Sequence, residues 1–145
     1  MFMSQDRAEL RQVYITAWHK RCHGLPLEPL ETLVAGVIAL HPEYHKMLSN
    51  AESAREQDFQ PEGGQTNPFL HMGLHIAVAE QCATHRPAGI NEIYQTLVLK
   101  HGDAHTAEHV IMESIAEMLW QAQRDNTLPD ENTYLRHLRE QVRDT

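Results

Sequence analysis

The stretch NPFLHMGLHIAVAEQCA, at residues 67–83, is the clearest indication of a helical fold in this sequence. Asn67 followed by Pro68 is a typical helix start, because asparagine can cap free amide groups and proline suits the first helical turn. Apolar residues then occupy nearly every face of the predicted helix, which is the pattern of a helix buried among others. His71 and His75 lie four residues apart within it, so they share one helical face.

Apolar residues at intervals of three and four predict further helices on both sides of this stretch. These helices are expected at residues 6–21, in the segment ending at residue 40, in a short turn at 42–48, at 90–102, at 103–125 and from residue 129 onward. Residues 49–66 are polar and contain Pro61 and two adjacent glycines, which predicts one long surface loop. The sequence thus predicts an all-α fold, in which residues 1–145 form a single-domain antiparallel bundle of about five or six helices.

The composition excludes several functional classes. Of the 145 residues, 41% are hydrophobic and 22% are charged, as in ordinary folded domains rather than disordered chains. Twelve basic and twenty acidic residues give a formal net charge of −8, which argues against nucleic acid and anionic membrane surfaces as partners. Because there is no apolar signal segment, we expect a soluble cytoplasmic protein. The absence of a glycine-rich phosphate loop argues against a nucleotide cofactor.

The sequence is rich in histidine, with eleven copies against only two cysteines. Five pairs are spaced four apart, the spacing that stacks two imidazoles on one helical face: 19/23, 41/45, 71/75, 101/105 and 105/109. The two cysteines, Cys22 and Cys82, lie outside any CxxC motif and are expected to be small buried hydrophobic residues.

Two helices carry the best candidate metal ligands. His71 and His75 lie in the predicted buried helix, where each imidazole needs a hydrogen-bond partner or a metal ion. His105, His109 and Glu113 follow one another at intervals of four and form one stripe of a second helix. Nitrogen and oxygen ligands of this kind suit zinc, iron, nickel or copper. The sequence therefore predicts a transition-metal site between the helices at 68–83 and 103–125.

The other histidines are weaker candidates. His41 and His45 could contribute ligands, but solvated positions at a helix end are the favoured interpretation for both. Their motif, HPEYH, differs from the zinc-protease motif HExxH, in which glutamate directly follows the first histidine. The remaining candidates, His19, His23, His85 and His137, are expected at the surface.

Several sequence blocks resemble a bacterial family of small proteins, the domain-of-unknown-function family 1841. The blocks are GLPLEPLE (24–31), HPEYH (41–45), PEGGQTNPFLHMGLH (61–75), RPAGI (86–90) and HGDAHTAEH (101–109). The resemblance covers nearly the whole chain and implies a soluble single-domain protein. It implies no activity, cofactor or partner.

Three functional hypotheses follow from the sequence. The first is a metal-binding helical bundle, whose ion could activate water or bind a small ligand if one coordination position stays open. The alternative is a non-catalytic protein-interaction module without metal, which would use the long loop and nearby histidines as its surface. A third is a pH-responsive switch, because clustered imidazoles repel one another when protonated. The sequence indicates neither a reaction nor a substrate, and a homo-oligomer is compatible with it.

Overall fold

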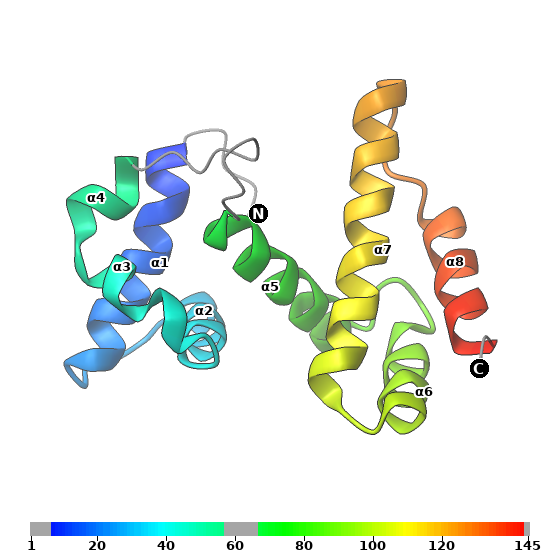
Figure 1. Cartoon of the computed structure of the whole chain (residues 1–145), viewed down its shortest axis with the longest axis horizontal. Helices are drawn as coiled ribbons and strands as arrows, with labels where there is room; N and C mark the ends of the chain where they lie inside the picture. The colour runs from blue at the N-terminus through cyan, green and yellow to red at the C-terminus, as the bar shows by residue number, and fades with distance from the viewer. Residues whose placement is uncertain (1–6, 57–66, 144–145) are drawn as a thin grey trace. The chain divides into compact units, whose positions relative to one another are not determined.

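A computed structural model describes residues 7–56 and 67–143 of the chain (Figure 1). Regular structure in these ranges consists of helices without strands, which confirms the predicted all-α class. The elements are α1 (Arg7–Cys22), α2 (Pro29–Ala39), the 3-10 helix η1 (Pro42–Tyr44), α3 (His45–Ser49), α4 (Ala51–Glu56), α5 (Pro68–Thr84), α6 (Ile90–His101), α7 (Ala104–Asp125) and α8 (Glu131–Arg143). None of the helices in the described ranges combines the length and apolar character needed to cross a lipid bilayer.

The predicted helix starts have a clear local cause. The Asn67 side-chain oxygen accepts a hydrogen bond from the Phe69 amide at 2.9 Å, which caps the first turn of α5. Asp103 caps α7 in the same way, because its carboxylate accepts from the Thr106 amide at 3.0 Å. Short polar side chains thus fix the start of both helices that carry the candidate ligands.

The structure contains a helix, α4, at residues 51–56, where the sequence predicts the first part of a loop at 49–66. The predicted loop therefore begins too early. The buried guanidinium of Arg11 explains this difference. Its Nη1 donates to the carbonyl of Ala54 at 3.1 Å and to that of Arg55 at 3.4 Å, which satisfies carbonyls that a short helix leaves without partners. This stabilisation comes from α1 and has no local sequence signature. Residues 57–66 lie outside the described residues.

The chain divides into two compact units, residues 1–76 and residues 77–145. That residues 1–145 form a single domain stays a prediction. In the first unit α1 packs against α2 and α4. The first half of α5 completes its core, which is built from fully buried side chains: Tyr14, Val34, Ile38, Met72 and Ile76. The Tyr14 ring meets the Phe69 ring edge to face, with centroids 5.3 Å apart.

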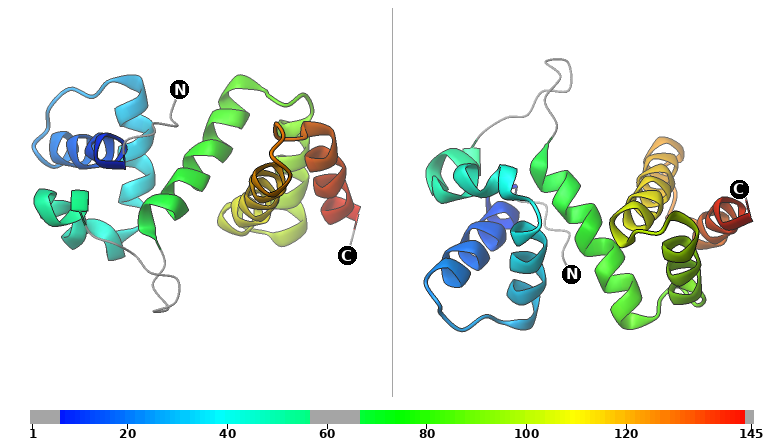
Figure 2. Two further views of the ribbon diagram at one scale, coloured as in Figure 1. Left: turned by 90° about the horizontal axis from the view of Figure 1, so that it is seen from above. Right: turned by 60° about the horizontal axis from the view of Figure 1, so that its bottom comes forward.

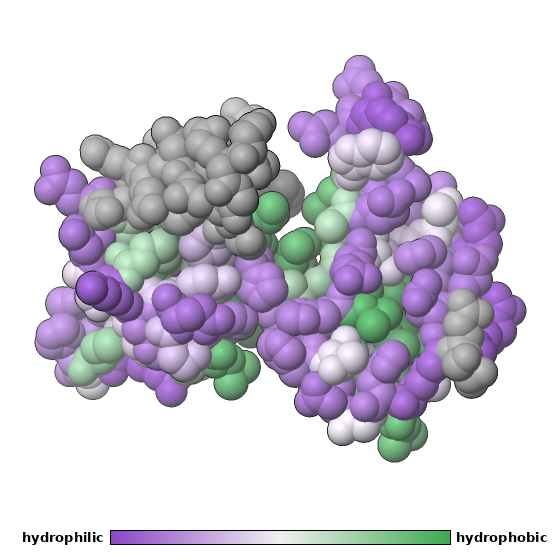
Figure 3. All heavy atoms as spheres, viewed as in Figure 1, coloured by the Kyte–Doolittle hydropathy of each residue, from purple (hydrophilic) through white to green (hydrophobic). Residues whose placement is uncertain are grey.

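The second unit contains the rest of α5 together with α6, α7 and α8. Helix α7 packs against both α6 and α8, and the further views display these three helices side by side (Figure 2). Ile90, Leu97, Ile111 and Leu138 are fully buried. The Tyr134 hydroxyl donates to the Gln81 side chain at 2.7 Å, which ties α8 to the end of α5. Hydrophilic residues dominate the visible surface of this unit, with small apolar patches between them (Figure 3).

Candidate metal centre

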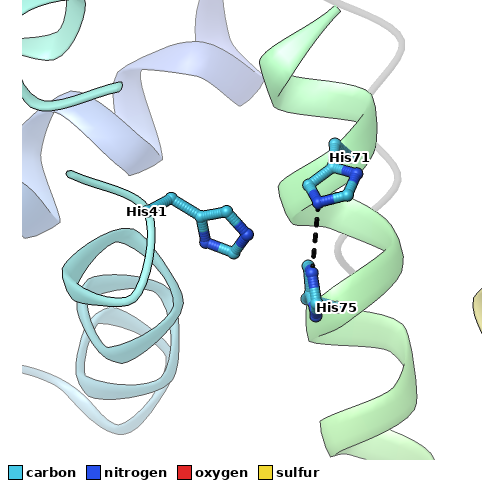
Figure 4. A group of neighbouring side chains, drawn as sticks. All are labelled: His41, His71 and His75. Atoms are coloured by element: carbon cyan, nitrogen blue, oxygen red, sulfur yellow. Dashed lines mark hydrogen bonds between the residues drawn. The ribbon is translucent and has the colours of Figure 1, made fainter. Parts of the chain in front are cut away.

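Helix α5 presents His71 and His75 on the same face, as their spacing predicts. Their Nε2 atoms are 3.2 Å apart, so one ring donates a hydrogen bond to the lone pair of the other (Figure 4). His75 is only 4% exposed, whereas His71 is half-buried. One ring of the pair is therefore buried and the other is partly open to solvent.

The third histidine, His41, comes from the chain segment that follows α2. Pro42 disfavours the helical conformation at the residue before it, so α2 ends and His41 adopts φ −125° and ψ 70°. The ring is 4% exposed and points toward α5 (Figure 4). Its centroid lies 4.8 Å from that of His75 and 5.2 Å from that of His71. The three rings thus form one cluster within the first unit.

A backbone carbonyl sets the tautomer of the neutral His41 ring. Its Nδ1 lies 2.7 Å from the Val37 carbonyl oxygen, which can only accept a hydrogen bond, so Nδ1 carries the proton. The Nε2 atom of the neutral ring then carries the lone pair that a metal ion would need. A carbonyl partner of this kind orients the histidine ligands of metal sites in proteins.

The distances within the cluster suit a small metal ion. One ligand atom from each histidine lies within 4.8 Å of the other two. For a tetrahedral zinc ion with bonds of about 2.0–2.1 Å, ligand nitrogens would be about 3.3–3.4 Å apart. The Nε2 atoms of His71 and His75, 3.2 Å apart, are close to that separation.

Of the two aromatic side chains that follow His41 closely in the chain, Tyr44 contacts its ring and His45 does not. Tyr44 stacks on the His41 ring with an interplanar angle of 9° and a centroid distance of 5.5 Å. Burial, and then the charge of Glu43, raises the pKa of Tyr44, so its phenol stays neutral. His45 faces elsewhere: its Nε2 donates to the Ile38 carbonyl at 2.8 Å and its ring packs on Trp18, with centroids 4.3 Å apart.

These positions correct two expectations. His41 is buried rather than solvated, because α2 ends before Pro42 and the carbonyl of the buried residue Val37 accepts a hydrogen bond from the ring. Pro42, directly after His41, indicates from the sequence that the helix ends there. It does not specify which side chains the His41 ring contacts. Cys22 is exposed rather than buried, since it lies at the end of α1, and Cys82 is partly buried.

The second predicted ligand group lies on α7, in the second unit. The His105 and His109 rings lie against each other with centroids 4.2 Å apart and an interplanar angle of 58°. His105 and Glu113 are exposed, while His109 is half-buried. That these three residues share an ion with His71 and His75 stays a prediction. Among the surface predictions, exposure is confirmed for His19, His23, His85 and His137.

The family described as domain of unknown function (DUF1841) matches residues 6–140, nearly the whole chain. The chain belongs to this family. No curated protein and no solved structure matches the chain. Because the description of DUF1841 specifies no activity, the function has to be argued from the side chains themselves.

Proposed function

We propose that this DUF1841 protein binds one transition-metal ion through the Nε2 atoms of His41, His71 and His75. The observation that carries the proposal is the convergence of three imidazoles from two separate chain segments on one point, two of them almost fully buried.

The 3.2 Å separation between the Nε2 atoms of His71 and His75 supports this assignment. A metal ion bound by both histidines needs the lone pair of each Nε2 atom. The ring that now donates its Nε2 proton therefore has to carry that proton on Nδ1 instead. Neutral histidine permits this exchange of tautomers without any change of charge. His41 needs no such exchange, because the Val37 carbonyl already holds its proton on Nδ1.

The ligand set favours an ion with an open coordination position. Among the described residues, no carboxylate or thiol belongs to this cluster. Three neutral imidazoles leave the full charge of a divalent ion in place, which favours water, hydroxide or a small anion as the fourth ligand. Such an ion could act as a Lewis acid or lower the pKa of bound water. We therefore favour reversible binding of a small ligand, with hydrolysis as the chemistry that an open zinc site would add.

Cobalt(II) substitution tests this function, because cobalt reports its geometry in the visible spectrum. We expect untagged protein to give the strong visible bands of a four-coordinate cobalt site and sodium azide to shift them. Made in Cys22→Ser protein, so that no thiolate contributes, His71→Ala should lose the bands, whereas His101→Ala, a matched exposed histidine, should keep them. A wild-type protein that gives no such bands would contradict the proposal and favour the interaction module. Bands that azide leaves unchanged would contradict the open position.

A further inference from the structure

The C-terminal end of α1 carries a second group of metal-binding residue types, His19, Cys22 and His23. The spacing of three and four residues places them on one side of the helix. All three are exposed, and they border a surface cavity of about 310 Å³ whose walls include Trp18 and Leu48. The His19 and His23 rings lie against each other with centroids 4.1 Å apart.

The backbone holds this helix end in a defined conformation. The Leu25 amide donates to the Lys20 carbonyl at 2.9 Å and the Gly24 amide donates to the Arg21 carbonyl at 3.3 Å. Gly24 adopts φ +66°, a left-handed conformation that glycine accepts without strain. These two bonds form the Schellman motif that commonly ends helices. The Cα atoms of the three candidate ligands are therefore fixed before any ion binds.

A carbonyl also sets the tautomer of His23. Its Nδ1 lies 2.8 Å from the His19 carbonyl oxygen, so Nδ1 is the protonated nitrogen and Nε2 carries the lone pair. The arrangement is the same as that between His41 and Val37. Here it orients the ring at the surface, where the preceding residue, Cys22, is also exposed.

The helix dipole favours a cation at this position, whereas the charge of the neighbouring Arg21 opposes it. Carbonyl groups at a helix C-terminus carry partial negative charge, which attracts positive ions. The nearby Lys20 is engaged elsewhere, since its ammonium contacts both carboxylate oxygens of Glu31 at 2.9 Å. A divalent ion beside Cys22 would stabilise the thiolate, the form of cysteine that binds metals.

We propose that His19, Cys22 and His23 form a second metal site, which takes zinc or a comparable thiophilic ion at the surface of the first unit. One thiolate and two imidazoles are ligands that zinc uses in proteins, with water in the fourth position. The three ligand atoms are not gathered within 4.8 Å of one another as those of the buried cluster are. Binding therefore requires rotation of exposed side chains, and this site should be the weaker and more exchangeable of the two.

Cobalt(II) titration of untagged, reduced protein tests this site separately from the buried one. A thiolate bound to cobalt adds a charge-transfer band in the near ultraviolet, which a cluster of imidazoles alone does not produce. We expect this band in the wild-type protein and in Cys82→Ser, and its loss in Cys22→Ser. His19→Ala and His23→Ala should weaken it, while His101→Ala should leave it unchanged.

Thiol labelling gives a second readout that does not depend on cobalt. In Cys82→Ser protein, zinc should slow the reaction of Cys22 with a disulfide reagent, and the double variant His19→Ala/His23→Ala should abolish this protection. The absence of a thiolate band at saturating cobalt would overturn the proposal, as would equal zinc protection in the double variant. Either result leaves the visible bands of the sulfur-free cluster intact, so the two sites are tested independently.

Discussion

Helices α5 and α7 each carry two histidines four residues apart, yet they place them in different surroundings. On α5, His75 is 4% exposed and its partner His71 meets it through a 3.2 Å hydrogen bond, with His41 facing both. On α7, His105 is exposed although its ring lies just as close to that of His109. The spacing alone therefore creates a pair of rings. A buried cluster in the first unit also requires a third ring, delivered by a separate chain segment and oriented by a carbonyl.

The largest expected effect concerns the packing beneath the α5 pair. Met72 is fully buried beside these histidines, and its truncation to alanine should lower the free energy of unfolding by about 2–5 kcal/mol. Leu70, on the same helix but 64% exposed, is the matched control and should change stability little when truncated. Denaturant unfolding of both variants measures this difference. Equal losses would contradict the burial of one face of α5.

The next effect distinguishes the two histidine pairs directly. Zinc at a free concentration one hundred times its Kd should stabilise the wild-type protein by about 2.7 kcal/mol, because it binds only the folded state. We expect His75→Ala to lose this stabilisation and His105→Ala to keep it, measured by thermal unfolding with and without zinc. A loss in His105→Ala as large as in His75→Ala would instead favour the site predicted from the sequence, between the helices at 68–83 and 103–125.

A smaller effect tests the support of the third ring. Tyr44 stacks on His41, and aromatic pairs of this kind contribute about 0.5–1.5 kcal/mol. Tyr44→Ala should therefore weaken zinc binding by up to about tenfold, whereas Tyr44→Phe should preserve it. Competition titration with a zinc-binding dye measures both affinities. An unchanged affinity in Tyr44→Ala would mean that the stacking does not position the ring.

The smallest effect concerns the start of α7. Hydrogen bonds from the side chain and amide of Thr106 lower the pKa of Asp103. The cap should therefore be fully stabilising at neutral pH, and its contribution should be lost as the pH falls below about 4, through the lowered pKa of the folded state. Asp103→Ala should lower Tm at neutral pH, and its difference from wild type should shrink in acid. A constant difference across this range would argue against the charged cap.

The helices were largely predictable from the sequence because their determinants are local. Apolar periodicity, the Asn67 and Asp103 caps and the prolines identify the helices and most of their bounds. The helix α4 was missed because the buried Arg11 that satisfies its carbonyls comes from a distant part of the chain. Tertiary contacts of this kind leave no periodic signal.

The candidate site was only half predictable for a similar reason. Spacing and burial identify His71 and His75, but nothing in the HPEYH motif indicates that His41 turns toward α5. That orientation depends on the break before Pro42 and on the Val37 carbonyl that the end of α2 leaves available. In contrast, the His105, His109 and Glu113 stripe has the clearer sequence pattern but the more exposed surroundings.

The central claim, that His41 is the third ligand, can be tested with two isosteric substitutions. His41→Asn keeps a donor for the Val37 carbonyl but removes the Nε2 lone pair, and His45→Gln keeps a donor for the Ile38 carbonyl. Both are made in untagged Cys22→Ser protein, so that the surface thiol does not contribute. Zinc content is measured by elemental analysis after loading and desalting. We expect one zinc ion per chain in Cys22→Ser and in the His45→Gln variant, and none in the His41→Asn variant. One zinc ion retained in the folded His41→Asn variant would contradict that claim.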